Sequence, residues 1–482
     1  MPAASADPLS RRQGFLAQIR WTPPEATGRR PIVAVLDTGV DASDPDLRDA
    51  VLTAQARSFV PGMDPLVDAS GHGTHVAGIV AATTGNGIGG AGVSSARILP
   101  VTIADASGRA TTSALVRGIR YATARGARVV NISFGGEGFS QLEQDAIDAA
   151  VRRGVLVVVP VGNTGGRPGP PEYPGAYRHV MTVAALGRDG RVMPLSERGD
   201  QVSIAAPGER VFSNDVGGTA RLVPRTGTSM SAAVVAGAAA RVIAARPGLS
   251  AQRVRTLLES TARDVPPGGV DSASGAGALD LEAALAAAPP PPEDPEPNDD
   301  TAQAARTRVL LGASATSAAV TGRTGSYSDP RDGFRVVLRA GERVTAQLAP
   351  LEPSTADLDL ALWRPGTPAT RRGSTFARSW LVAASLRPGI DESLTAVAPE
   401  NGVYTLEVQG LRSAAAYRLT VSRSVTGAAR DYARRPAWSM MGDHGDHEGG
   451  NPDAGPLGSG PLHQPRALLA RLQRARAGAG AR

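Results

Sequence analysis

The first two thirds of the chain alternate apolar runs with amphipathic segments. Five runs are apolar throughout, as expected for strands buried on both faces of a parallel sheet: PIVAVLDTGV, ARVVNISFGG, GVLVVVPVGN, HVMTVAAL and QVSIAAPG. Stretches with helical spacing lie between them, such as TSALVRGIRYATARG and SQLEQDAIDAAVRRG, and each ends in glycine, a common helix stop. This order predicts an α/β domain over residues 31–287, with a parallel sheet covered by helices on both faces.

The pattern changes on either side of this domain. Residues 1–30 are polar and irregular and form an N-terminal extension, and residues 288–297 form a proline-rich linker. Residues 298–423 contain short segments such as DGFRVVLRAG and YRLTVSR, whose alternating apolar and polar positions predict an all-β sandwich domain. Residues 424–482 lack periodicity and are rich in Gly, Pro, Arg and Asp, so we predict a disordered tail.

The amino-acid composition excludes several types of catalytic and metal-binding groups. The 482 residues include no cysteine and no lysine, so all 51 basic residues are arginine. Disulfides, Cys-ligated zinc, thiol nucleophiles and catalytic lysines are therefore excluded, and a nucleophilic enzyme would use serine, threonine or a carboxylate. A net charge of +6 favours a solvated surface over nucleic-acid binding. No apolar run reaches the roughly 18–20 residues of a membrane span, and no signal-peptide core is visible near the start.

An aspartate and two histidines lie where strands and helices meet. Asp37 ends the run PIVAVLD, and ligands of open parallel sheets bind outside the carboxyl ends of the strands. A capping or turn aspartate is the alternative. In SGHGTHVAG, His72 precedes the first helical turn and can face the crevice, whereas His75 is expected to be a buried structural residue. HGTH lacks the i, i+4 spacing and the glutamate of a metalloprotease helix.

A serine and an asparagine occupy similar positions. Ser229 opens the apolar helix of TGTSMSAAVVAGAAA, where unpaired N–H groups favour a developing negative charge. The alternative for Ser229 is a helix N-cap. Asn163 ends the run GVLVVVPVGN, where its amide can donate to an oxyanion, and the alternative is a turn residue.

Four segments in this order resemble one family. LDTGVDASDPDL, SGHGTHVAGIVAA, PVGN and TGTSMSAAVVAGAAA are similar to the signatures of subtilisin-like serine proteases, in the family order Asp, His, Asn, Ser. The resemblance implies a serine endopeptidase that works through an acyl-enzyme intermediate. It implies a catalytic triad of Asp37, His72 and Ser229, with Asn163 as an oxyanion donor.

The resemblance also implies how substrate is held. The segment Ser133, Phe134, Gly135 and Gly136 resembles the family strand that pairs with substrate backbone. Gly162 lies in the stretch that would form another wall of the primary specificity pocket. Protein or peptide substrates are the expected partners, with no nucleic acid and no transmembrane segment.

No cofactor is expected for the chemistry, but the resemblance points to structural calcium. Asp46 and Asn86 match positions of a calcium site in many subtilases, where the loop TGNGIGG would supply carbonyl oxygens. A Gly-rich turn without an ion is the alternative. The DHGDHE stretch at 443–448 also has metal-binding residue types, but its setting in the tail favours a solvated segment.

The chain departs from the family pattern in two places. Ala233 and Val234 replace the usual Pro and His after the serine motif, which predicts a looser helix start. Asp44 replaces the usual His of the HPDL motif.

The second domain has its own resemblance. EPNDD, DLDLALW and NGVYTLEV are similar to the bacterial pre-peptidase C-terminal domain, a jelly-roll-like sandwich appended to secreted proteases, which favours an extracellular location. The competing function is an inactivated protease that serves as a binding protein. A lipase with the same triad is excluded because Ser229 lacks a Gly-x-Ser-x-Gly elbow.

Overall fold

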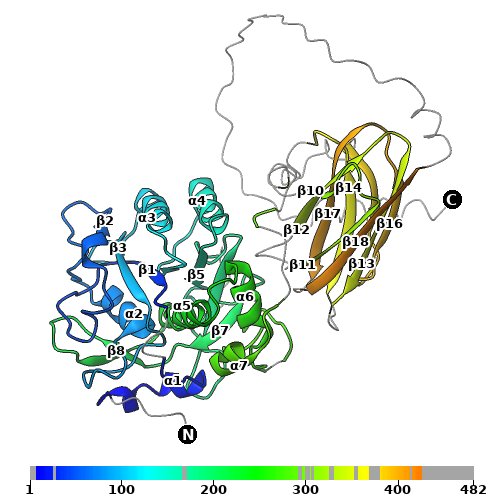
Figure 1. Cartoon of the computed structure of the whole chain (residues 1–482). Helices are drawn as coiled ribbons and strands as arrows, with labels where there is room; N and C mark the ends of the chain where they lie inside the picture. The colour runs from blue at the N-terminus through cyan, green and yellow to red at the C-terminus, as the bar shows by residue number, and fades with distance from the viewer. Residues whose placement is uncertain are drawn as a thin grey trace, which may run out of the picture.

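The α/β region is built on a seven-stranded parallel sheet with the strand order β2-β3-β1-β4-β5-β6-β7 (Figure 1). The computed structural model describes residues 7–24, 29–165, 171–266, 268–290, 296–298, 304, 309–324, 331–351, 356–367, 380–412 and 415–425. The strands of the sheet are β1 (Ile32–Asp37), β2 (Arg57–Ser58), β3 (Arg97–Thr102), β4 (Val129–Ile132), β5 (Leu156–Pro160), β6 (Val180–Leu186) and β7 (Ile204–Pro207). The predicted parallel α/β architecture is confirmed.

Side chains of β1 alternate between two hydrophobic layers. Val33 and Val35 of β1 pack in the layer that contains α2 and α5, whereas Ala34 and Leu36 pack against α3 and α4. Burial on both faces explains why these runs are apolar at every position. The helices are α2 (His72–Ala81), α3 (Thr112–Ala124), α4 (Gln141–Val151), α5 (Thr228–Ala245), α6 (Ala251–Ser260), α7 (Leu281–Ala286) and the short η2 (Thr53–Gln55).

The central helix α5 is buried along most of its length. Ala233 and Val234 are fully buried in it, and the helix runs without interruption, so the looser start predicted from these two residues is not observed. Among the described residues, α5 is the one helix long and apolar enough to cross a membrane, but 78% of it is buried inside the domain. It is the core helix of the α/β region.

Two parts of this region were not predicted. Strand β3 lies beside β1 although it contains Pro100, and a proline within an apolar run argues against a central strand. The antiparallel hairpin of β8 (Val211–Asn214) and β9 (Leu222–Arg225) covers α2, where the Ser213 hydroxyl donates to the His75 carbonyl oxygen at 2.8 Å.

The N-terminal segment is more ordered than its sequence suggested. It contains η1 (Ser10–Arg12) and α1 (Gly14–Gln18), and its large apolar side chains Phe15, Leu16, Ile19 and Trp21 belong to the same core as α2 and α5. Four apolar residues spread over an otherwise polar stretch give no clear periodicity, yet the segment packs on the domain as one of its parts.

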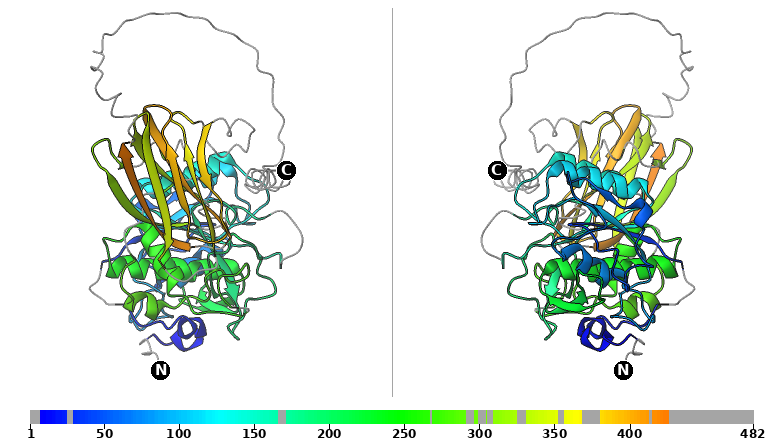
Figure 2. Two further views of the ribbon diagram at one scale, coloured as in Figure 1. Left: turned by 90° about the vertical axis from the view of Figure 1, so that its right-hand side faces the viewer. Right: turned by 90° about the vertical axis from the view of Figure 1, so that its left-hand side faces the viewer.

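The C-terminal region consists of two antiparallel-dominated sheets around one core (Figures 1 and 2). On β13, Val344, Ala346 and Leu348 are buried while Arg343 and Gln347 are exposed, which is the alternation that the sequence showed. The sheets contain β10 (Val309–Leu311), β12 (Arg331–Leu338), β17 (Gly402–Arg412), β14 (Asp357–Trp363) and β15 (Leu381–Ser385), and β11 (Ser317–Thr324), β18 (Ala415–Val425), β13 (Glu342–Pro350) and β16 (Ser393–Val397). An all-β region therefore follows the α/β region, as predicted.

Two predictions fall largely outside the described residues. The tail from 426 onward, with the DHGDHE stretch, lies outside them, and so does residue range 291–295 of the proline-rich linker.

Candidate active site

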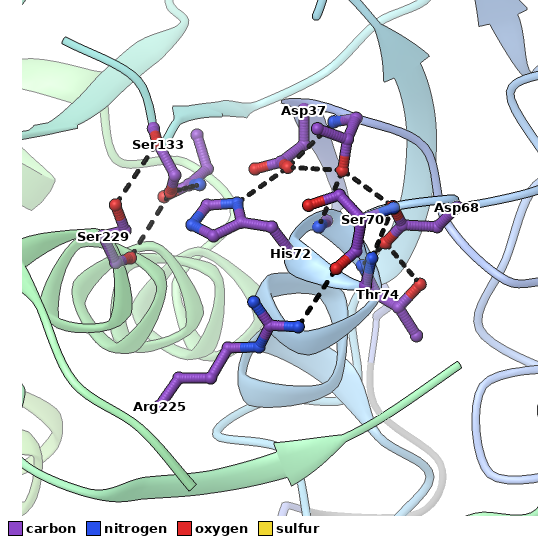
Figure 3. Close-up of polar contacts among 12 residues, drawn as sticks. Asp37, Asp68, Ser70, His72, Thr74, Ser133, Arg225 and Ser229 are labelled. Carbon is purple, nitrogen blue, oxygen red and sulfur yellow. Dashed lines mark hydrogen bonds and ion pairs between the residues drawn. The ribbon is translucent and has the colours of Figure 1, made fainter. Parts of the chain in front are cut away.

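The buried Asp37 and the partly exposed His72 form a hydrogen-bonded pair at the carboxyl end of the sheet. Asp37 is the last residue of β1 and His72 the first residue of α2, and His72 Nδ1 lies 2.8 Å from Asp37 Oδ1 (Figure 3). The helix start was expected one residue later. Asp37 also accepts the backbone N–H of Thr38 at 2.8 Å. These contacts hold the carboxylate toward one nitrogen of the imidazole.

A glycine allows this approach. A Cβ atom at Gly73 would lie 2.1 Å from the carbonyl oxygen of Gly39 and 2.9 Å from the Cβ of Asp37. A side chain at this position would push α2 away from β1, and the Asp37–His72 distance would grow. The Gly after His72 in the SGHGTH segment is therefore needed for the pair to form.

Asp68 accepts hydrogen bonds from residues that flank Asp37 and His72. It was not identified as a site residue from the sequence. Its Oδ1 accepts from the Thr38 hydroxyl at 2.8 Å and from the Gly71 N–H at 2.9 Å, and its Oδ2 accepts from the Thr74 N–H and hydroxyl, both at 2.8 Å. Asp68 thus ties the residue after Asp37 to the first turn of α2. The available signal was an aspartate three residues before a glycine at a helix start, which is a capping position.

The electrostatics of His72 follow from this environment. Burial alone would lower the pKa of His72, but the Asp37 carboxylate, through its charge and its hydrogen bond, raises the pKa above the ordinary value. His75, three residues along the same helix, is fully buried, and burial lowers its pKa to about 3. Its Nε2 lies 3.0 Å from the Val223 carbonyl oxygen. His75 is therefore a neutral core residue, as predicted.

Ser229 lies across the crevice from Asp37, with the His72 ring between them (Figure 3). It is the second residue of α5, and Gly227 occupies the N-cap without a side-chain cap bond. The N-cap alternative for Ser229 is therefore wrong. Its hydroxyl donates to the Ser133 carbonyl oxygen at 3.2 Å, and in this conformation no hydrogen bond joins it to His72. Such bonds are often loose before substrate binds.

Asn163 sits beside the start of α5. Its Oδ1 accepts from the Thr228 N–H at 3.0 Å and from the Thr228 hydroxyl at 3.1 Å. The side chain is exposed at the edge of the crevice. Asn163 thus contacts Thr228, the residue that precedes Ser229. From the sequence, only the resemblance to the family predicted that Asn163 and Ser229 lie close together.

The two expected substrate-binding segments flank this point. Ser133 contacts Ser229 in both directions, since its hydroxyl donates to the Ser229 carbonyl oxygen at 3.3 Å. The Phe134 ring lies 5.9 Å from the His72 ring, centroid to centroid. Gly135 and Gly136 follow Phe134 on this side, and Gly162 precedes Asn163 on the other.

Asp46 and Asn86 are also brought together. Asp46 Oδ1 accepts from Asn86 Nδ2 at 2.9 Å, and Oδ2 accepts from the Gly90 N–H at 3.0 Å. Burial raises the pKa of Asp46 to about 6, so its charge lacks full compensation. No cluster of three or more acidic, His or Cys residues fit for a metal occurs among the described residues. The donor set of carboxylate, amide and loop carbonyls still matches the chemistry that calcium prefers.

A carboxylate, an imidazole and a hydroxyl on three separate elements at the carboxyl edge of a parallel sheet are the groups that the class of serine hydrolases uses. The sequence profile described as the Subtilase family matches residues 28–277, just over half of the chain. The chain therefore belongs to the subtilase family of serine endopeptidases.

Individual relatives agree with this assignment. The chain is 38% identical to Subtilisin Savinase of Lederbergia lenta over 259 residues, covering 54% of this chain and 91% of that protein. It is 36% identical to Thermitase of Thermoactinomyces vulgaris, covering 55% of this chain and 91% of that protein. It is 38% identical to Fervidolysin of Fervidobacterium pennivorans, but spans only 41% of that longer protein.

A solved structure of proteases from Pseudoalteromonas arctica matches with a TM-score of 0.52 and 29% identity, covering 59% of this chain and 99% of that one. Each of these similarities covers little more than half of this chain.

Proposed function

We propose that the protein hydrolyses peptide bonds through an Asp37–His72–Ser229 triad. The observation that carries this proposal is the 2.8 Å contact of His72 Nδ1 with Asp37, which leaves Nε2 on the side of Ser229 (Figure 3). An imidazole held in this way has the tautomer that a general base needs. The opposite nitrogen is then free to accept the hydroxyl proton.

The reaction divides into two stages. Ser229 attacks the scissile carbonyl while His72 takes its proton, and His72 then gives the proton to the leaving amine. Asp37 stabilises the imidazolium that forms in between. Water hydrolyses the acyl-enzyme by the same sequence of proton transfers.

The oxyanion of each tetrahedral intermediate must be stabilised by hydrogen-bond donors. The backbone N–H of Ser229 lies in the first turn of α5, where N–H groups lack helical acceptors. The Asn163 amide is the second donor in this proposal. The segment Ser133 to Gly136 would pair with the substrate backbone as an added strand, and Gly162 would line the opposite wall.

Three further assignments belong to this proposal. Asp46 and Asn86 would hold a structural calcium ion, together with carbonyl oxygens of the loop TGNGIGG that contains Asn86 and Gly90. The β-sandwich would act as a pre-peptidase C-terminal-like domain. Both this resemblance and the family favour action outside the cell, which fractionation of an expressing culture into cells and supernatant would test.

A fluorophosphonate probe tests the central claim. The probe should label the wild-type protein at Ser229, and Ser229→Ala should abolish both labelling and peptide hydrolysis. Triad residues act as a unit, so kcat should fall by about 10⁶, the size known for subtilisin itself. An inactivated binding protein would remain unlabelled, and a Ser229→Ala variant that hydrolyses peptides near the wild-type rate would overturn the triad.

A further inference from the structure

Two glutamates that the mechanism does not use are fixed to the two substrate-binding walls. Glu172 precedes Tyr173, whose backbone exchanges hydrogen bonds of 2.9 and 2.8 Å with Gly136. The backbone N–H of Glu197 donates to the Gly162 carbonyl oxygen at 3.1 Å. Each glutamate is therefore held by main-chain contacts against one of the segments that flank Ser229.

Their carboxylates converge on a single point. A Cβ atom at Gly162 would lie 2.2 Å from Glu197 Oε2 and 2.9 Å from Glu172 Oε2. A Cβ atom at Gly135, on the other wall, would lie 2.6 Å from the same Glu172 oxygen. The Glu172 carboxylate thus lies close to both walls, and the Glu197 carboxylate lies close to it at Gly162.

Among the described residues, no arginine or histidine forms an ion pair with either glutamate. Glu197 is only 7% exposed, and its Oε2 has no hydrogen-bond partner within the described part of the chain. Burial raises the pKa of Glu197 to about 7, with a further contribution from the charge of Glu172. Burial also raises the pKa of Glu172, and the carboxylate of Glu137 adds to the shift. A buried carboxylate without a partner is costly, and a cation placed between the two would remove that cost.

We propose that Glu172 and Glu197 form the acidic floor of the primary specificity pocket and select substrates with arginine or lysine at P1, the residue on the amino side of the cleaved bond. This inference rests on the proposed peptidase function and names its substrate class.

The chemistry of the pocket supports a basic side chain. A guanidinium carries five N–H donors in a planar fork and can bond two carboxylates at once, and an ammonium can bond both with less directional contact. Because Gly135 and Gly162 have no side chains, the carboxylate oxygens of Glu172 and Glu197 come close to the backbone of both walls. An apolar P1 side chain would instead bury both carboxylates unpaired, and sites of that kind discriminate strongly.

Peptide anilides that differ only at P1 test the proposal with the full-length protein. The series contains arginine, lysine, leucine and citrulline, which has the shape of arginine without its charge. We expect kcat/KM for arginine to exceed that for citrulline by about 10- to 100-fold, the range for a charge-assisted hydrogen bond. Lysine should also exceed leucine. This comparison needs no variant, so it does not depend on the folding of a mutant.

Variants of Glu172 and Glu197 test whether these two residues cause the preference for arginine at P1. Glu172→Gln and Glu197→Gln should each lower the arginine-to-citrulline ratio by about 10-fold or more while the fluorophosphonate still labels the protein. The matched control is Glu282→Gln, an exposed glutamate in the first turn of α7, which should keep the wild-type ratio.

Two results would overturn the inference. One is a wild-type protein that is labelled by the probe yet cleaves citrulline or leucine substrates as well as arginine substrates. The other is an arginine preference that survives in both glutamine variants. Absence of labelling in the wild type would instead overturn the proposed function on which the inference rests.

Discussion

The side-chain oxygen of Asn163 accepts a hydrogen bond of 3.0 Å from the backbone N–H of Thr228. A backbone N–H can only donate, so the bonded atom of Asn163 must be the oxygen, and the amide nitrogen is directed elsewhere. Asn163 is also not among the described non-glycine residues with positive φ, which are Arg20, His179, Arg210 and Ala220. Asn163 therefore lacks the left-handed backbone conformation that a turn asparagine often adopts.

Asn163→Ala should lower kcat by about 10²–10³, a magnitude that comes from the corresponding amide of subtilisin, because the amide meets charge that develops only in the transition state. KM should change little, since the ground-state carbonyl is not its target. Steady-state kinetics and a thermal melt on one purified preparation separate the roles. A lower melting temperature with unchanged kcat per folded molecule would make Asn163 a structural residue.

The pH dependence of hydrolysis should follow His72. The proposed triad requires the neutral imidazole, and Asp37 raises the pKa of His72 above its ordinary 6.5, so activity should rise with pH through a midpoint above about 6.5. A pH–rate profile of kcat/KM measures this midpoint in the free enzyme. Removing the attraction should shift the acidic limb downward, so Asp37→Asn, with its small residual activity, should show a midpoint at lower pH.

His75 provides the matched control for His72. His72→Ala should remove the acidic limb together with most of the activity. His75→Ala should lower the melting temperature and leave kcat per folded molecule close to wild type, because His75 is a buried, neutral residue whose ring contacts Val223. Equal losses of kcat in the two folded variants would show that the wrong histidine has been assigned as the base.

Asp68→Ala should destabilise the protein and weaken catalysis together. The change leaves the buried N–H groups of Gly71 and Thr74 without their acceptor, at a cost of about 1–3 kcal/mol in the free energy of unfolding. It also removes the acceptor that holds the Thr38 hydroxyl beside Asp37, so kcat should fall. Urea unfolding and kinetics measure the two effects.

The control for Asp68 is Asp105→Ala. Asp105 accepts the N–H groups of Ser107 and Arg109 in an exposed turn, where water can replace the carboxylate, so its removal should cost much less stability than the loss of Asp68. If both changes cost the same and kcat is unaltered in Asp68→Ala, Asp68 has no part in holding the catalytic pair.

Calcium removal tests the loop that contains Asn86. If Asp46 and Asn86 hold a calcium ion, EGTA should lower the melting temperature and added calcium should restore it. Asp46→Asn should be insensitive to EGTA. A wild-type melting temperature that does not respond to EGTA would leave Asp46 as a carboxylate satisfied by the N–H donors of Asn86 and Gly90.

The sequence predicted the helices and strands whose hydrophobic pattern and end residues lie within one continuous segment. Strands buried on both faces are apolar at every position, so β1 and β5 were recognised, and Gly-ended helices such as α3 were recognised for the same local reason. Asp37 and His72 were found because each lies at the end of such an element. Their 2.8 Å contact could not be derived, since it depends on a close approach permitted by Gly73.

Features that arise from contacts between distant segments were missed. Glu172 and Glu197 are 25 positions apart and lie in loops without periodicity, and only the fold brings both carboxylates to Gly162. Trp21 packs in the core, and its indole N–H donates to the Val93 carbonyl oxygen at 3.1 Å, a contact across 72 positions. No pattern within a polar segment encodes such a partner.

The placement of Ser229 on α5 has a consequence for how the enzyme loses activity. Most residues of this helix are enclosed between the sheet and the surrounding helices, so its amide hydrogens should exchange with solvent only when the whole α/β region opens. The proposed nucleophile is thus part of the helix for which we expect the slowest exchange, while the loops around it should exchange earlier. Local opening of those loops would alter substrate binding, but the reactive serine should persist until global unfolding.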